Sequence, residues 1–183
     1  MFPKYFATKN KNKLREVNEI LGFNLEQISI ELFEPQSLDV EFVVSEKAKD
    51  AFFKTGKLVL VEDTGLEFLA WNGLPGALIK CFLESVGKEG ILSMLTSEMN
   101  RKAIATTVVA FFDGIKVHSF AGSISGTISK KVRGNSGFGW DPIFIPDGYD
   151  KSFAEMTPVE KNAISMRKLA LERMKLDLRQ KNR

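Results

Sequence analysis

The spacing of apolar positions switches along the chain between a helical period and an alternating one. Apolar residues three or four positions apart predict helices, whereas alternating or continuous apolar runs predict strands. In the first half the predicted helices span 10–21 and 44–54, and the predicted strands span 4–8, 25–32, 58–61 and 66–70. The run Leu58-Val59-Leu60-Val61 is apolar throughout, which is typical of a buried central strand.

The second half adds elements of both kinds. One or two helices are expected across 77–95, and two β-rich ranges, 104–112 and 115–129, are separated by the hairpin signal Asp113-Gly114. Thr157-Pro158-Val159-Glu160 combines a capping box with a proline at the first helical position, so it predicts a helix that continues to about Leu178. Strand–helix units together with a long hairpin predict an α/β fold around a mixed β-sheet. No repeat or long linker divides the chain, so we expect one domain across residues 1–183.

Composition and charge narrow the class of protein. Hydrophobic residues make up 44% and charged residues 27% of the 183 residues, which is the balance of a globular protein in water. No apolar run approaches the ~20 residues that span a bilayer. The N-terminus lacks the regions of a signal peptide, so we expect a cytoplasmic protein. The formal net charge of +3 is too balanced to indicate a nucleic-acid-binding protein.

The single cysteine and the single histidine exclude several kinds of site. Cys81 alone cannot form an intrachain disulfide or a thiolate zinc cage, and one histidine excludes multi-histidine metal sites. His118 lies in a predicted strand and is expected to be structural. An enzyme of this composition would depend on carboxylates, lysines and a hard metal ion.

Three lysines surround the start of the first predicted helix, in Thr8-Lys9-Asn10-Lys11-Asn12-Lys13. The helix dipole and the free N–H groups already make this end of a helix electropositive. The lysines are therefore repelled by the helix end, unless a bound phosphate attracts both. The alternative is that the lysines point into water and that Asn10 or Asn12 simply caps the helix.

Two adjacent carboxylates follow the predicted central strand, in Glu62-Asp63-Thr64-Gly65. Ligand sites in α/β sheets lie beyond the carboxyl ends of strands. Adjacent acids at such a place cost repulsion and desolvation unless a cation or hydrogen bonds compensate. Mg²⁺ fits, because it takes one or two carboxylates together with phosphate oxygens and water. A tight turn with exposed acids would explain the segment equally well.

A third cluster combines glycines, aromatic residues and an acid, in Arg133-Gly134-Asn135-Ser136-Gly137-Phe138-Gly139-Trp140-Asp141-Pro142. Glycines let the backbone approach a ligand closely. A planar base could stack on Phe138 or Trp140, and Asp141 could accept hydrogen bonds from a purine edge. The alternative is a packed loop whose aromatic side chains close the core.

The chain contains no Walker A sequence, no G-x-G-x-x-G fingerprint and no D-x-D pair. Instead, a set of short segments is spread over nearly the whole chain. The segments are Thr8-x-Asn10-x-x-Lys13, Val61-Glu62-Asp63-Thr64-Gly65-Leu66, Gly73-Leu74-Pro75-Gly76, Gly137-Phe138-Gly139-Trp140-Asp141-Pro142, Phe153-Ala154-Glu155-Met156 and Glu160-Lys161-Asn162-Ala163. Together they resemble the motifs of the inosine triphosphate pyrophosphatase family. Each motif alone is weak, but their common order is specific.

The resemblance implies a role for each matching residue. The residues that contact the triphosphate, or face the site beside it, would be Thr8, Asn10, Lys13, Lys47, Thr64 and Lys80. Mg²⁺ would be bound by Glu34 and Asp63, and Asp63 would also activate the attacking water. The base pocket would be formed by Phe138, Gly139, Trp140 and Asp141, with Lys161 and Arg167 reaching the 6-oxo group of the purine.

One substrate-binding position departs from the family. The family usually shows Ser-His-Arg where this chain has Ser165-Met166-Arg167, so a base contact from that histidine is absent. Met166 is expected to pack instead, because it shares a helical stripe with four other residues. They are Val159, Ala163, Ala170 and Met174.

The resemblance further implies an elongated, two-lobed homodimeric enzyme with its cleft between the lobes. It would hydrolyse purine nucleoside triphosphates such as ITP, dITP and XTP to the monophosphate and pyrophosphate. Two alternatives stay open at this point. One is a pyrophosphatase for modified pyrimidine triphosphates, and the other is a non-catalytic nucleotide- or RNA-binding module. Adjacent acids disfavour the second, because without a metal they would repel phosphate.

Overall fold

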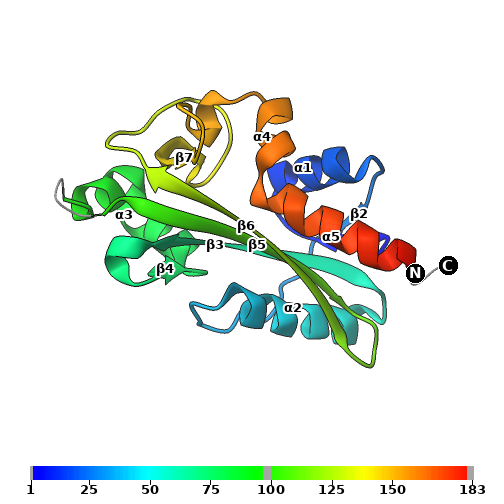
Figure 1. Ribbon diagram of the computed structural model, residues 1–183. Coiled ribbons are helices and arrows are strands. Elements are labelled where there is room, and N and C mark those ends of the chain that lie inside the picture. The colour runs from blue at the N-terminus through cyan, green and yellow to red at the C-terminus, as the bar shows by residue number, and fades with distance from the viewer. Residues whose placement is uncertain (1, 97–99, 181–183) are drawn as a thin grey trace.

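The computed structural model describes residues 2–96 and 100–180, so residues 1, 97–99 and 181–183 of the expected domain lie outside the described part. Its sheet has the strand order β2-β1-β3-β5-β6-β7, and β4 pairs with β3 (Figure 1). The strands are β1 (Tyr5–Ala7), β2 (Glu26–Ile28), β3 (Val59–Phe68), β4 (Pro75–Gly76), β5 (Lys102–Phe112), β6 (Val117–Ile128) and β7 (Phe144–Pro146).

The sheet is mixed, as the sequence predicts. β1 is parallel to both β2 and β3, because helices connect these strands. β5 is antiparallel to β3 and to β6, and the turn at Asp113-Gly114 joins β5 to β6 as a hairpin. The α-helices of the described residues are α1 (Lys11–Leu21), α2 (Val40–Thr55), α3 (Ile79–Met94), α4 (Pro158–Ile164) and α5 (Met166–Gln180).

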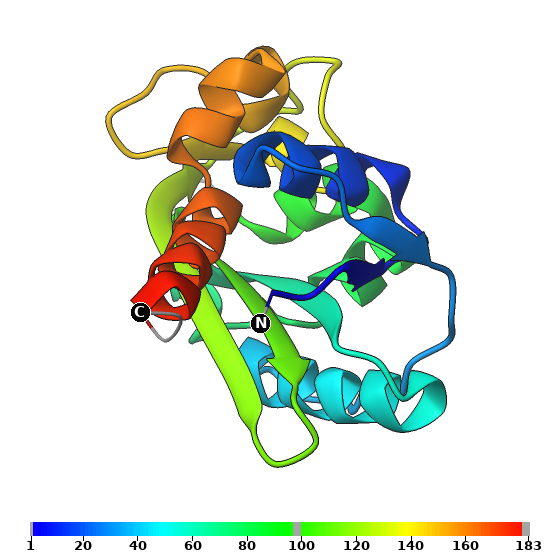
Figure 2. The same ribbon diagram turned by 90° about the vertical axis from the view of Figure 1, so that its right-hand side faces the viewer.

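Helices cover both faces of the sheet at one end of the molecule. Figures 1 and 2 show α2 on one face and α1 and α5 on the other. Alternation along β3 matches this arrangement, since Val59 and Val61 pack with α2 whereas Leu60 packs with α1 and α5. None of the helices in residues 2–96 and 100–180 combines the length and the apolar character that a membrane crossing requires.

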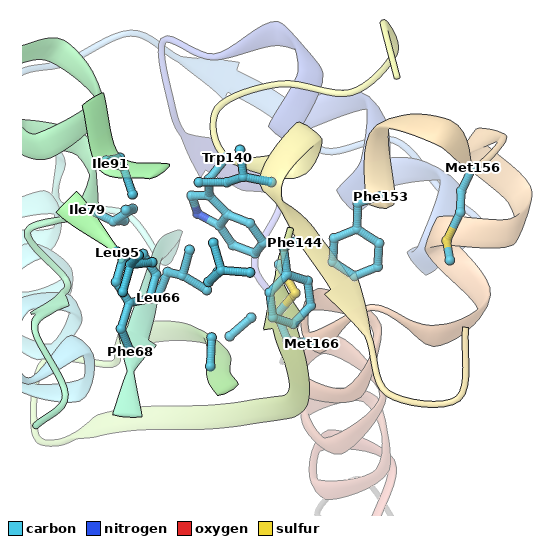
Figure 3. Close-up of a cluster of buried hydrophobic side chains, with 14 residues drawn as sticks. Leu66, Phe68, Ile79, Ile91, Leu95, Trp140, Phe144, Phe153, Met156 and Met166 are labelled. Atoms are coloured by element: carbon cyan, nitrogen blue, oxygen red, sulfur yellow. The ribbon is translucent and has the colours of Figure 1, made fainter. Parts of the chain in front are cut away.

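A separate hydrophobic cluster forms the second lobe, around the far half of β3, α3 and the segment 128–156. Trp140, Phe144 and Phe153 lie together in its centre (Figure 3). The long strands β5 and β6 run across the molecule (Figure 1). β3 and β5 contribute side chains to all three hydrophobic clusters and so connect the two lobes.

Several element boundaries differ from the predicted ones. β3 is a single ten-residue strand, so the predicted strands 58–61 and 66–70 are one, and Glu62-Asp63-Thr64-Gly65 is neither a turn nor a strand end. Pairing with β5 continues through the whole segment and keeps it extended. Gly65 permits a close approach to α2 there, because a Cβ at this position would lie 2.6 Å from Val40 Cγ2.

The expected long helix after Pro158 is broken. Ser165 has φ −68° and ψ 152°, which ends α4, and α5 starts at Met166. Val159 is 80% exposed and Ala163 is also exposed, so neither belongs to the predicted stripe. Met166, Ala170 and Met174 are buried as expected. The predicted strand 25–32 forms only over Glu26–Ile28, and α2 begins at Val40 because Asp39 caps it, rather than at residue 44.

Candidate active site

Two adjoining cavities lie along the cleft. The polar cavity, about 440 Å³, is lined on one side by Thr8, Glu34 and Lys47. The apolar cavity, about 250 Å³, is lined by the second group of predicted residues. That group is Thr64, Phe138, Gly139, Trp140, Asp141, Lys161, Met166 and Arg167. The residues common to both cavities are Asn10, Lys13, Asp63 and Lys80. The structure thus brings all predicted site residues together, and their individual roles remain predictions.

The start of α1 contributes a cap and a cation. Asn10 Oδ1 accepts hydrogen bonds from the N–H groups of Asn12, at 2.9 Å, and Lys13, at 3.2 Å, so Asn10 caps the helix. Lys13 Nζ lies 3.2 Å from Glu62 Oε1. Lys9 instead pairs with Glu31 on the surface. Only one of the three lysines at this helix start, Lys13, therefore lines both cavities while paired with a buried acid.

The two adjacent acids of β3 point to opposite sides of the sheet. Glu62 is buried on the side of α1 and α5, where it receives hydrogen bonds from Arg167 Nε, at 2.7 Å, and Arg167 Nη2, at 2.9 Å. Burial alone would raise the pKa of Glu62, but the charges of Arg167 and Lys13 outweigh it and lower that pKa to about 2. Both oxygens of Glu62 are therefore engaged by protein cations, and Asp63 alone of the pair lines both cavities.

Asp63, Glu34 and Lys47 form the acidic part of the polar cavity. Lys47 Nζ lies 2.8 Å from Glu34 Oε1 and 4.0 Å from Asp63 Oδ1, and it donates a hydrogen bond to the Glu62 carbonyl at 3.1 Å. Burial raises the pKa of Asp63, and the neighbouring lysines offset this only in part. Burial also acts on Glu34, but the charge of Lys47 prevails and the pKa of Glu34 is lowered.

This donor set fits a hard divalent cation. Glu34 and Asp63 come from separate segments and meet around a single ammonium group. Mg²⁺ is usually bound through one or two carboxylates plus phosphate oxygens and water. The open polar cavity beside these two acids leaves room for the remaining ligands.

Buried ion pairs form the floor of the apolar cavity. Lys161 Nζ lies 2.7 Å from Asp141 Oδ2 and 2.9 Å from Glu16 Oε1. The other oxygen of Glu16 accepts a short hydrogen bond from Arg167 Nη1. Glu16 is 4% exposed. Its two oxygens bind Lys161 and Arg167, the two cations that are predicted to contact the base.

Glu16 is not part of any motif that predicted the site from the sequence. Its one signal in the sequence is its position, since an acid at residue 16 falls on the helical face that also carries Lys13 and Val17. No sequence pattern indicates its distant partners Lys161 and Arg167, which are brought to it by α4 and α5.

Phe138 and Trp140 differ in their surroundings, one fitting the base-pocket interpretation of the loop and the other the packed-core interpretation. Trp140 is 7% exposed and packs edge-on against Phe144, at 5.4 Å between ring centroids, so it closes the core while lining the cavity (Figure 3). Phe138 is half-buried, and Lys161 Nζ lies 4.6 Å from its ring centroid. The Phe138 N–H donates to Asp141 Oδ2 at 2.7 Å. Burial raises the pKa of Asp141, and the charge of Lys161 offsets part of this effect.

Three further predicted residues differ in their surroundings. Thr64 Oγ1 shares a hydrogen bond with Thr107 Oγ1 at 2.9 Å. Lys80 has a side chain that is 75% exposed and reaches over both cavities from the start of α3. Met166 is 2% exposed and belongs to the core cluster, so it presents an apolar wall to the cavity.

Comparison with known proteins shows which family the chain resembles over its length. The model of the Ham1 family matches residues 4–176. The chain is 44% identical over 181 residues to the inosine triphosphate pyrophosphatase of Yarrowia lipolytica, covering 96% of this chain and 95% of that protein. It is 41% identical over 172 residues to the dITP/XTP pyrophosphatase of Methanopyrus kandleri, covering 92% of each. The solved structure of a HAM1 protein from Coxiella burnetii superimposes with a TM-score of 0.83 at 29% identity, covering 98% of this chain and 100% of that one. The chain therefore belongs to the Ham1 family.

Proposed function

We propose that this protein hydrolyses ITP, dITP and XTP to the nucleoside monophosphate and pyrophosphate. The observation that carries the proposal is the pair of adjoining cavities, one lined by lysines and carboxylates and the other by aromatic rings and buried cations. A nucleoside triphosphate has this same division between a charged and a planar end. Relatives named as dITP/XTP and inosine triphosphate pyrophosphatases support the choice of substrate.

The triphosphate would lie in the polar cavity. Lys13 and Lys47 would neutralise charge that develops on the phosphate oxygens during attack at the bond between the α- and β-phosphates. Asp63 would accept a proton from the attacking water. Its raised pKa makes it a stronger base than an exposed aspartate, which favours this role.

We propose Mg²⁺ as the cofactor, held by Glu34 and Asp63. When bound, it would supply charge neutralisation and polarise the water. In the structure Lys47 joins these two acids and compensates their charge.

The base would enter the apolar cavity and stack on Phe138. Lys161 and Arg167 would donate hydrogen bonds to its 6-oxo group, whereas the 6-amino group of adenine would leave a buried donor unpaired. Glu16, Glu62 and Asp141 already occupy several of their donor groups. Selectivity would therefore depend on the donors that remain, and on the geometry that the acids impose on the cations.

One assay tests the proposed function. Pyrophosphate release is measured for ITP, XTP, ATP, GTP, and standard and modified pyrimidine triphosphates, with and without Mg²⁺. We expect Mg²⁺-dependent release that is fastest with ITP and XTP. Preference for a modified pyrimidine would contradict the purine assignment. Nucleotide binding that survives EDTA without pyrophosphate release would indicate a binding module instead.

We also propose that the protein works as a cytoplasmic homodimer on free nucleotides, without nucleic-acid or membrane partners. The family resemblance supports the dimer, and the near-balanced net charge of +3 supports the absence of nucleic acid. Light scattering on a sizing column should give twice the chain mass, and a mass of one chain would contradict the dimer.

A further inference from the structure

The segment between β2 and α2 carries Glu34 but has no regular structure over residues 29–37. In the described part of the chain, the backbone of residues 30–36 is held by hydrogen bonds to two side chains of α2. The Phe33 N–H donates to Asp50 Oδ2 at 2.8 Å, and Lys54 Nζ donates to the Glu31 carbonyl at 2.8 Å. Helix α2 therefore replaces the strand partner that this segment lacks.

These two side chains are also joined to each other. Lys54 Nζ lies 2.8 Å from Asp50 Oδ2, so that one oxygen accepts from both the helix lysine and the segment backbone. The hydrogen bonds from Lys54 and from the Phe33 N–H lower the pKa of Asp50, as expected for a carboxylate that accepts from both groups.

The pair continues a row of charges along α2 that reaches the polar cavity. Lys47, Asp50 and Lys54 are spaced three and four residues apart, which places them on one side of the helix. Lys47 contacts the Glu34 carboxylate at 2.8 Å, one residue beyond the position where Asp50 binds Phe33. Docking of the backbone and placement of the Glu34 side chain thus occur at neighbouring points of the same surface.

We propose that Asp50, assisted by Lys54, is a positioning residue that docks residues 31–33 on α2 and thereby holds the Glu34 carboxylate beside Asp63. The inference rests on the proposed function, because Glu34 is a metal ligand only there. When a segment is docked only part of the time, its metal-binding side chain is correctly placed only during that fraction. The apparent affinity for the metal ion falls by the same fraction. Loss of Asp50 should therefore weaken metal use without changing selection of the base.

The test compares Asp50→Ala with Glu46→Ala. Glu46 is a suitable control, because it also pairs with a lysine on α2, Lys49 at 2.6 Å, but forms no hydrogen bond or ion pair with the described residues 29–37. We expect Asp50→Ala to raise the Mg²⁺ concentration for half-maximal ITP hydrolysis about fivefold. This change corresponds to a segment that is docked about one fifth of the time. Hydrogen exchange in peptides covering 29–37 should accelerate, and the ITP-to-ATP ratio at saturating Mg²⁺ should stay unchanged. Glu46→Ala should alter none of these.

A double-mutant cycle shows whether Asp50 acts through Glu34. In a Glu34→Gln background, Asp50→Ala should add almost nothing to the Mg²⁺ requirement, because the ligand it positions is gone. A full fivefold effect there, unchanged exchange, or faster exchange with an unchanged Mg²⁺ requirement would each overturn the proposal. Lys54→Met provides a second variant if Asp50→Ala does not fold, and it should act in the same direction.

Different measurements distinguish failure of the proposed function from failure of the positioning role. A wild-type protein that releases no pyrophosphate from any nucleotide would refute that function. Hydrogen exchange in Asp50→Ala would still report whether the segment depends on Asp50 for docking. Normal exchange together with a normal wild-type assay would refute the positioning role alone.

Discussion

At the scale of single residues, neighbouring side chains have separate tasks because a strand points them to opposite sides. Glu62 faces α1 and α5 and binds Arg167 and Lys13. Asp63 faces the polar cavity and Lys47. Of the two acids, only Asp63 lines both cavities, whereas both oxygens of Glu62 are engaged by protein cations.

Asp63→Asn should lower the rate of ITP hydrolysis far more than tenfold while the protein stays folded. The amide neither accepts the proton of water nor binds a cation strongly. Steady-state kinetics with a thermal melt provide the measurement. Retention of more than about a tenth of the wild-type rate, or about 1.4 kcal/mol in barrier, would contradict an essential role.

Glu16→Gln should reduce the preference for ITP over ATP. The neutral amide cannot accept from both Lys161 and Arg167, so their donors lose the orientation on which selection of the 6-oxo group depends. We expect kcat/KM for ITP to fall at least tenfold, with a smaller change for ATP. Glu19→Gln is the control on the same helix, because Glu19 is exposed and contacts Asn162 rather than the cavity. Equal losses for both nucleotides would show that Glu16 is only structural.

At the scale of elements, the start of α1 combines a favourable cap with unfavourable charge. Asn10 satisfies two N–H groups, but the first turn contains no acid and carries Lys11 and Lys13. Lys13 has a buried partner in Glu62, whereas Lys11 is exposed. The two lysines therefore affect stability with opposite signs.

Lys13→Ala should lower the free energy of unfolding by about 1 kcal/mol, because a buried carboxylate loses one of its cations. Lys11→Ala should leave stability unchanged or raise it by a few tenths of a kcal/mol, since it removes a cation from the positive helix end. Melting curves with and without ITP measure both effects. Only Lys13→Ala should also weaken stabilisation by the nucleotide, and an equal response of the two variants would contradict this assignment.

At the scale of the whole molecule, the charge network makes stability depend on pH. The pKa of Glu62 falls from 4.5 to about 2 on folding, so its contribution is present above pH 4.5 and is lost as the pH falls towards 2. Asp63 and Asp141 have raised pKa values, so their ionisation lowers stability as the pH rises above about 3.8. These two acids oppose Glu62, whereas other carboxyls with lowered pKa values, such as Glu34 and Asp113, add to its effect.

Glu62→Gln should be less stable than wild type at neutral pH, because Arg167 loses a charged partner. It should also lose less stability between pH 4.5 and pH 2, since the group that titrates there is gone. The difference between the two pH profiles should be on the order of 3 kcal/mol. Chemical denaturation across this range measures it, and parallel profiles would exclude Glu62 as the source.

The sequence by itself determined the α/β class, most of the elements and the composition of the site. Local periodicity and capping residues depend on neighbours in the chain, which explains why α1 and the β5–β6 hairpin were predicted close to their final bounds. Thr8, Asp63 and Asp141 were predicted because motifs carry residue identity. All predicted site residues line the two cavities.

Only the tertiary structure decided which partners these residues meet. Cross-strand pairing with β5 kept Glu62 and Asp63 within a strand, although a turn was possible from the sequence. The break at Ser165 separates α4 from α5, which contribute Lys161 and Arg167 to the same acid, Glu16. Glu16 lies 145 and 151 residues from these partners, and contacts at such separations leave no periodic pattern in the chain.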